Sequence, residues 1–344
     1  MNRPSPRGKL EFGTGSSNFQ AICDNNMGAF AMHLRLGTRG SILARNQAAQ
    51  VADLLAARGF EVETVIIRTT GDKYQEGLPP LGKDRGIFTK ELQHALLEGK
   101  IDLAVHSLKD VPTDPVQGLR IGAVLPRASP FDVLVGRTSV ELSGISALGR
   151  IGTGSARRKA QLLYLFPHMV IEPIRGNVDT RLRKLDEGQF DAIILAEAAM
   201  ERLGLHQRGY LRLPGAFMLP APAQGAIAVE IRTDDPQIRQ IVGELDHLPS
   251  RAAVEAERHF LRVLQGGCLA PVAALGIVRG DRLILAGRVL SPDGRKRLDG
   301  TLSSLLTEAE RLGERLAEQL LDQGAAPLIT AAREASPGQT TYFS

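Results

Sequence analysis

The chain has 344 residues, 43% of them hydrophobic and 23% charged, a length that predicts two or three domains. It has no apolar run of the roughly 18 residues that span a membrane, so no membrane segment is expected. Its aromatic content of 4% and net charge of +4 disfavour nucleic-acid binding.

Residues 1–31 carry Gly, Ser, Asn and Pro without periodicity and lack the apolar core of a secretory signal. They are expected to form a disordered extension, or to precede the true start at Met32. The two cysteines, Cys23 and Cys268, do not make a disulfide framework. A cytosolic compartment is therefore expected.

Arginine is the dominant basic residue, with 33 of the 42 Lys and Arg side chains. Its planar guanidinium grips a carboxylate or phosphate through two hydrogen bonds, whereas Lys acts as a point charge. Because an Arg excess can also reflect a GC-rich genome, only the positions of the arginines decide between these interpretations.

The first strand-to-helix turn predicts an anion site. Residues 34–37 alternate like a strand, and residues 41–57 have apolar positions at helical spacing. Between them, Thr38-Arg39-Gly40-Ser41 presents free amides and a guanidinium. No Gly-Lys-Ser or Gly-Lys-Thr follows, so a carboxylate is a better candidate than a nucleotide phosphate.

The next motif places ionisable residues after a buried strand. A strand at 61–68, a polar loop at 70–86 and a helix at 88–97 lead to the apolar run 101–105. The loop suggests a lid or a disordered segment. His106, Ser107, Lys109 and Asp110 then stand where a parallel sheet forms its ligand crevice. Asp110 is the first candidate catalytic residue, the alternative being an Asp that caps a turn.

A second unit repeats this arrangement after strands at 119–124 and 131–135, with 126–130 as a possible crossover between domains. Residues 150–155 run into a helix that begins with Arg157 and Arg158, which oppose the helix dipole and suggest that an anionic ligand offsets them. The third glycine of a dinucleotide fingerprint is missing. Strands at 170–174 and 191–195 follow, the first preceding Arg175 and Arg181.

Five arginines thus fall at strand-to-helix turns: Arg39, Arg157, Arg158, Arg175 and Arg181. Two such units facing each other would form a cleft for a polyanion. The alternative is a set of solvated surface arginines, which would instead scatter along outer helix faces.

After a Pro- and Gly-containing break at 220–225, the sequence predicts a strand at 226–231 and helices at 236–245 and 251–264. A glycine loop then presents Cys268, followed by strands at 272–278, 283–289 and 297–302 and a helix at 307–323. A lone Cys is more often a small buried hydrophobe. Flanking Gly and Pro nevertheless favour an exposed, functional Cys268.

Taken together, these stretches resemble the hydroxymethylbilane synthase (porphobilinogen deaminase) family. The matching segments are LGTRGS (36–41), GIFTKEL (86–92), DLAVHSLKDVPT (102–113), IGTGSARRKAQL (151–162), RGNVDTRLRKLD (175–186), DAIILA (191–196), PAPAQGAIAVE (220–230) and GGCLAP (266–271).

The resemblance implies an α/β fold with two domains like type II periplasmic binding proteins and a small α+β C-terminal domain. Domain 1, with the catalytic Asp and the lid, would take 32–127 and 226–243. Domain 2, with the Arg-rich cleft, would take 128–225, and domain 3, with the cysteine, 244–344.

The resemblance also implies the site. Asp110 would be catalytic, and Cys268 would hold a dipyrromethane cofactor through a thioether. The other implied cofactor contacts are Lys109, Ser107, Arg157, Arg158, Ser155 and Phe88. The implied substrate contacts are Arg39, Ser41, Arg175, Arg181 and Gln224. No metal is expected.

The implied enzyme is a transferase that condenses four molecules of porphobilinogen and releases linear hydroxymethylbilane for tetrapyrrole and haem biosynthesis. It would be a cytoplasmic monomer that binds neither nucleic acid nor membrane. Arg85 stands where many members of the family have a lysine in the lid. An arginine side chain differs from a lysine side chain in its reach and in the planar geometry of its hydrogen-bond donors. A non-catalytic, two-lobed anion-binding or ligand-sensing protein is the alternative, but it requires neither Cys268 nor Asp110.

Overall fold

The computed structural model describes residues 32–69, 89–267 and 270–334. The predicted extension 1–31, the loop 70–86 with Arg85, and the predicted site residues Phe88 and Cys268 lie outside these ranges. The three sheets below all lie within residues 33–344.

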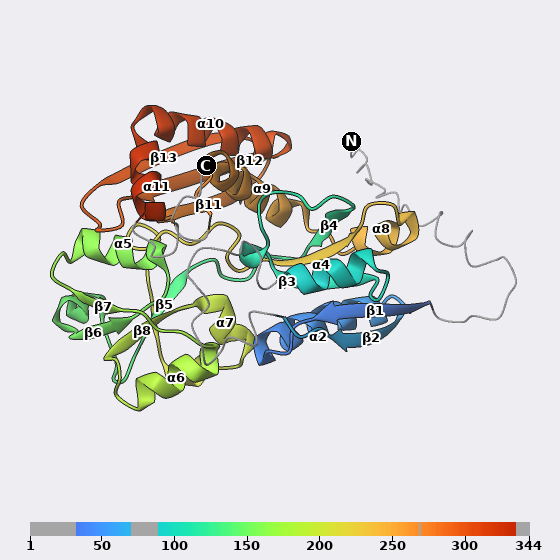
Figure 1. Ribbon diagram of the computed structural model, residues 1–344, viewed down its shortest axis with the longest axis horizontal. Coiled ribbons are helices and arrows are strands. Elements are labelled where there is room, and N and C mark those ends of the chain that lie inside the picture. The colour runs from blue at the N-terminus through green and yellow to red at the C-terminus, as the bar shows by residue number, and fades with distance from the viewer. Residues whose placement is uncertain (1–31, 70–88, 268–269, 335–344) are drawn as a thin grey trace, which may run out of the picture. The chain divides into compact units, whose positions relative to one another are not determined.

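The first sheet has the strand order β2-β1-β3-β10-β4 (Figure 1). Its strands are β1 (His33–Thr38), β2 (Glu61–Ile66), β3 (Leu103–Ser107), β4 (Leu119–Val124) and β10 (Ile227–Arg232). β1, β2 and β3 are parallel, whereas β10 is antiparallel to β3 and β4. Helices α2 (Ile42–Ala56), α4 (Lys90–Leu97) and α8 (Pro236–Gly243) contact it, and so does α9 (Leu248–Val263), through β4.

The second sheet has the order β7-β6-β8-β5-β9. Its strands are β5 (Asp132–Gly136), β6 (Arg150–Gly152), β7 (Val170–Glu172), β8 (Ala192–Ala196) and β9 (Leu211–Arg212). Its helices are α5 (Ala156–Leu165), α6 (Val178–Asp186) and α7 (Glu197–Arg202). Strand β8, all apolar and buried throughout, has the continuous hydrophobic run of a strand covered on both faces.

The two sheets have the same topology. In each, three parallel strands are followed by one antiparallel strand, β10 in the first sheet and β5 in the second, and then by an edge strand. This arrangement confirms the predicted α/β class with two similar domains. The exact domain boundaries stay a prediction.

The third sheet is an antiparallel meander of β11 (Val272–Arg279), β12 (Arg282–Leu290) and β13 (Arg297–Leu305). Three helices accompany it: α9 (Leu248–Val263), α10 (Ala309–Asp322) and α11 (Ala325–Glu334). The core between them is built around Phe260, Leu285 and Leu316, all fully buried. This is the small α+β unit that the sequence predicted.

Two chain segments cross between the first and second sheets and touch each other. The segment that leaves β4 for β5 meets the segment that returns to β10, and Ala128 N donates to Gly225 O at 3.3 Å. Gly225 has φ +89°, and a Cβ there would lie 2.5 Å from Ala128 O. Only glycine allows this approach.

The structure differs from the sequence prediction at one functional strand. β3 ends at Ser107 rather than at residue 105, because Ala228 and Ile227 of β10 pair with His106 and Ser107. The sequence also predicts neither α7 nor α11. Among the described residues, none of the helices is both long and apolar enough to cross a membrane.

Candidate active site

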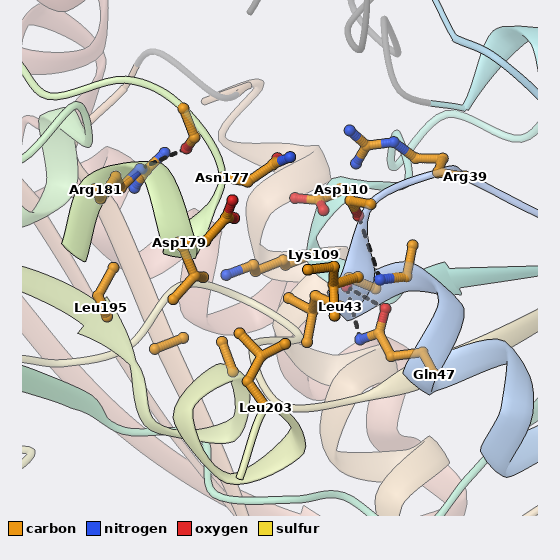
Figure 2. A pocket seen from close by; sticks show the side chains of 18 of the residues that line it. Arg39, Leu43, Gln47, Lys109, Asp110, Asn177, Asp179, Arg181, Leu195 and Leu203 are labelled. Carbon is orange, nitrogen blue, oxygen red and sulfur yellow. Dashed lines mark hydrogen bonds between the residues drawn. The ribbon is translucent and has the colours of Figure 1, made fainter. Parts of the chain in front are cut away.

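A cavity of about 450 Å³, a volume typical of small-molecule sites, lies where the two α/β units meet (Figure 2). Its walls come from the start of α2, the end of β3, the start of α6 and the segment from β8 into α7. Eight predicted site residues line it: Arg39, Ser41, Ser107, Lys109, Asp110, Arg158, Arg175 and Arg181.

Three other predicted site residues do not line the cavity. Arg157 and Gln224 are buried behind its wall, and Ser155 caps helix α5 by accepting a hydrogen bond from Arg158 N at 3.4 Å. Phe88 and Cys268 lie outside the described residues.

The α2 wall is fixed by local hydrogen bonds. Ser41 caps the helix by accepting from Ala44 N at 3.3 Å. Gln47, one turn further on, lies with Nε2 2.9 Å and Oε1 3.1 Å from Ser107 Oγ. Gln47, which sequence reasoning missed, therefore joins the first helix to the end of β3. In the sequence, only the position of this polar residue on the buried face of a helix could have pointed to Gln47.

Lys109 and Asp110 stand on a 3-10 turn, η1 (Leu108–Asp110), directly after β3. Arg258 of α9 holds this turn, with Nη1 donating to Val111 O at 2.8 Å and Nη2 to Pro112 O at 2.7 Å. Burial lowers the pKa of Arg258 to about 10. The sequence indicated only that Arg258 belongs to a helix, so its contact with the residues after η1 was not predicted.

Asp132, the first residue of β5, is the anion that faces Arg157 and Arg158. Its Oδ2 accepts from Arg157 Nη1 and its Oδ1 from Arg158 Nη2, both at 2.7 Å. The Asp132 side chain is fully buried, and both guanidinium groups are nearly so. Burial alone would raise the pKa of Asp132, but the two arginines hold that pKa well below its ordinary range.

This finding corrects the sequence interpretation of the two arginines. Their charge at the start of α5 was expected to be offset by a ligand, and the protein offsets it with its own carboxylate. Arg158 still borders the cavity, whereas Arg157 donates to Leu219 O at 2.7 Å behind it. Asp132 gave no motif signal, because an Asp at the start of a strand is unremarkable in sequence.

Gln224 connects this buried cluster to η1. Its Nε2 donates to Asp132 Oδ1 at 3.0 Å, and its Oε1 accepts from Lys109 Nζ at 3.5 Å. Lys109 is exposed to the solvent of the cleft, yet protein atoms crowd it from both sides. This crowding lowers the pKa of Lys109 to about 8. The negative charge of Asp110 acts in the opposite direction and raises the pKa, whereas the positive charge of Arg158 lowers it further.

The α6 wall adds further charge (Figure 2). Arg181 Nε donates to Gly176 O at 2.7 Å, and burial followed by the charge of Arg158 lowers the pKa of Arg181 to about 10. Arg175 and Asp179 also line the cavity. Sequence reasoning missed Asp179, although it lies inside the RGNVDTRL segment.

The arrangement suits a small ligand with several negative charges. Guanidinium groups come from both units, and an ammonium and a carboxylate stand together on η1. Guanidinium groups bind carboxylates through paired, charge-assisted hydrogen bonds. Asp110 has no hydrogen-bond or ion-pair partner among the described residues, so it is available to a cationic or N–H group of a ligand. No group of three or more His, Cys, Asp or Glu that could hold a metal occurs within 32–69, 89–267 and 270–334.

Comparison with known proteins gives consistent matches. The family model "Porphobilinogen deaminase, dipyromethane cofactor binding domain" matches residues 34–240, and "Porphobilinogen deaminase, C-terminal domain" matches 251–322. The porphobilinogen deaminase of Desulforudis audaxviator is 49% identical over 87% of this chain and 97% of its own. That of Pelotomaculum thermopropionicum is 44% identical over 88% and 97%.

Solved structures give a weaker match. The periplasmic VFT2 domain of Bordetella pertussis BvgS aligns with a TM-score of 0.38 and 13% identity, covering 62% of this chain and 86% of that one. A putative periplasmic sulfonate-binding protein of Methylobacillus flagellatus gives 0.38 and 15%, covering 64% and 67%. At these scores the structural matches carry no argument about function.

Proposed function

The chain belongs to the porphobilinogen deaminase family, and from this premise we propose that it is a transferase acting on porphobilinogen. It joins four molecules head to tail, with loss of ammonia at each step, and hydrolysis then releases linear hydroxymethylbilane. The observation that carries the proposal is the cavity in which the unpartnered carboxylate of Asp110 stands among basic side chains from both units.

The residues present fit a dipyrromethane cofactor. The cofactor carries carboxylates and pyrrole N–H groups, and the cavity offers guanidinium groups for the first and the Asp110 carboxylate for the second. Cys268 would hold it through a thioether, with Ser107, Lys109 and Arg158 as contacts at the cavity and with Ser155, Arg157 and Phe88 as further predicted contacts. When bound, the cofactor supplies a free pyrrole α-carbon as the nucleophile.

Asp110 has the central chemical role in this proposal. As ammonia leaves porphobilinogen, the substrate becomes a cationic azafulvene, and a nearby carboxylate lowers the energy of that charge. The same carboxylate can afterwards take up the proton lost from the attacking carbon. Arg258 keeps Asp110 in place by holding the carbonyls that follow it.

The predicted substrate contacts divide by position. Arg39 and Ser41 at the start of α2 face Arg175 and Arg181 at the start of α6 across the cavity, where they would bind the acetate and propionate groups. Gln224 stays behind the wall and would act by orienting Lys109. Each added pyrrole brings two carboxylates, so several basic groups are needed.

We also propose that the enzyme is a cytoplasmic monomer that binds neither nucleic acid nor membrane. Four of the five predicted arginines line a cavity instead of forming an exposed basic face, which favours a small anionic substrate.

Intact mass tests the proposal directly. The purified protein should carry a covalent adduct of two pyrrole units that reacts with Ehrlich's reagent, and Cys268→Ser should lack both, because a hydroxyl replaces the thiolate poorly in forming this bond. Cys23→Ser removes the only other cysteine and should keep the adduct. An adduct on Cys268→Ser would refute the assignment of Cys268. A wild-type protein that carries no adduct and consumes no porphobilinogen would favour the non-catalytic anion-binding alternative.

Lys109 gives a pH prediction. Its charge is present below its pKa of about 8 and lost above it, so the KM for porphobilinogen should rise by about three- to tenfold between about pH 7 and pH 9. Lys109→Arg stays charged throughout this range and should show a flatter KM profile. Because titration of the substrate affects both proteins alike, identical profiles would exclude Lys109 as the titrating group.

A further inference from the structure

Two carboxylates that line the cavity have no partner among the residues that the structure describes. Asp110 on η1 and Asp179 on α6 both line it, and neither has a hydrogen bond or ion pair with any described residue. Yet Lys109, Arg175 and Arg181 line the same cavity. Figure 2 shows the Asp179 side chain among the groups that surround the cavity. The proposed chemistry uses the carboxylate of Asp110 but does not require that of Asp179.

Helix stability alone offers one explanation for Asp179. It lies in the first turn of α6, where an acidic side chain interacts favourably with the helix dipole. Such an effect is small for an exposed residue. A role in helix stability does not require Asp179 to line a ligand cavity. Helix stabilisation and substrate binding therefore predict different effects of mutating Asp179.

The charges of the substrate give Asp179 a second role. Porphobilinogen carries two carboxylates and one primary amine, and a primary amine is protonated at neutral pH. Arginines can hold the two carboxylates, but they repel the ammonium group. A cleft that must accept this substrate therefore needs negative charge at entry, and Asp110 is needed for the step in which ammonia leaves.

We propose that Asp179 is a substrate-binding residue that pairs with the aminomethyl ammonium of incoming porphobilinogen. This inference rests on the proposed function. Asp179 attracts the ammonium from the α6 wall while Arg175 and Arg181 of the same wall hold carboxylates. The substrate is thereby bound in one orientation, with its leaving group toward Asp179.

Steady-state kinetics of the holoenzyme test the role. Asp179→Asn should raise the KM for porphobilinogen by about five- to tenfold, with a smaller change in kcat, because the lost pair lies in a partly open cleft. Asp179→Glu should recover most of the affinity. Asp53→Asn removes the same charge from an exposed position of α2 outside the cavity and should leave KM unchanged.

A neutral analogue separates recognition of the ammonium from general damage. A porphobilinogen analogue with a methyl group in place of the aminomethyl group is neutral at this position and has no leaving group, so it should compete equally well against wild type and Asp179→Asn. If its inhibition constant weakens by the same factor as KM, Asp179 shapes the cleft and does not bind the ammonium. An unchanged KM in Asp179→Asn would also overturn this inference. A wild-type enzyme that does not consume porphobilinogen would instead refute the proposed function.

Discussion

Asp110→Asn should lower the rate of porphobilinogen addition by about 100- to 1,000-fold, equivalent to about 3 to 4 kcal/mol of transition-state stabilisation. The amide has nearly the shape of the carboxylate and can still accept hydrogen bonds, but it carries no negative charge. The lost charge matters most as the substrate becomes cationic. The measurement is single-turnover incorporation, by mass, on protein confirmed to carry the cofactor.

Two variants control for loss of binding or of geometry. Asp110→Glu keeps the charge at a displaced position and should retain part of the activity. Asp179→Asn should affect KM more than the single-turnover rate at saturation. If Asp110→Asn stays within about threefold of wild type, Asp110 is structural and the catalytic carboxylate lies elsewhere.

The positions of most charged cavity residues could be predicted because they follow from topology. Carboxyl ends of parallel strands meet at one edge of a sheet, so Arg39 after β1 and Lys109 and Asp110 after β3 must converge. The second unit obeys the same rule with Arg175 and Arg181. Short motifs at these turns therefore contained most of the charged residues that line the cavity.

The partners of these residues could not be predicted, because they come from strands and helices far away in the sequence. Asp132 meets Arg158 only because antiparallel β5 lies beside β8. Arg258 reaches the turn after β3 from a helix of the third unit. Periodicity shows that these residues belong to particular elements, but it does not show which elements pack together.

The burial of Arg157 shows where sequence reasoning fails. An unfavourable charge at a helix start was recognised as needing an anion, and the structure supplies one anion from the protein itself, Asp132, while Arg158 still borders the cavity. In the structure the compensating charge is internal, which changes the expected effect of mutation from loss of ligand to loss of folding stability.

Asp132→Asn should therefore lower the free energy of unfolding by about 3 to 5 kcal/mol, the usual consequence of removing one partner of a buried ion pair. Arg157 and Arg158 would stay buried with their charges unopposed, and no other carboxylate hydrogen-bonds to either of them among the described residues. Urea unfolding of holoprotein provides the measurement. Glu187→Gln, which removes an exposed pair with Arg183, should cost less than about 1 kcal/mol.

The pH dependence of this effect has a definite sign. The pKa of Asp132 is lowered in the folded protein, so its contribution is complete above its unfolded pKa of about 4 and disappears as pH falls through the lower folded value. The stability difference between wild type and Asp132→Asn should be constant between about pH 8 and pH 5 and shrink below about pH 4. A difference that stayed constant down to about pH 2, or a cost no larger than that of Glu187→Gln, would show that Asp132 does not act through its charge. In that case the two buried arginines would need another source of compensation, and a bound anion would again be the first candidate.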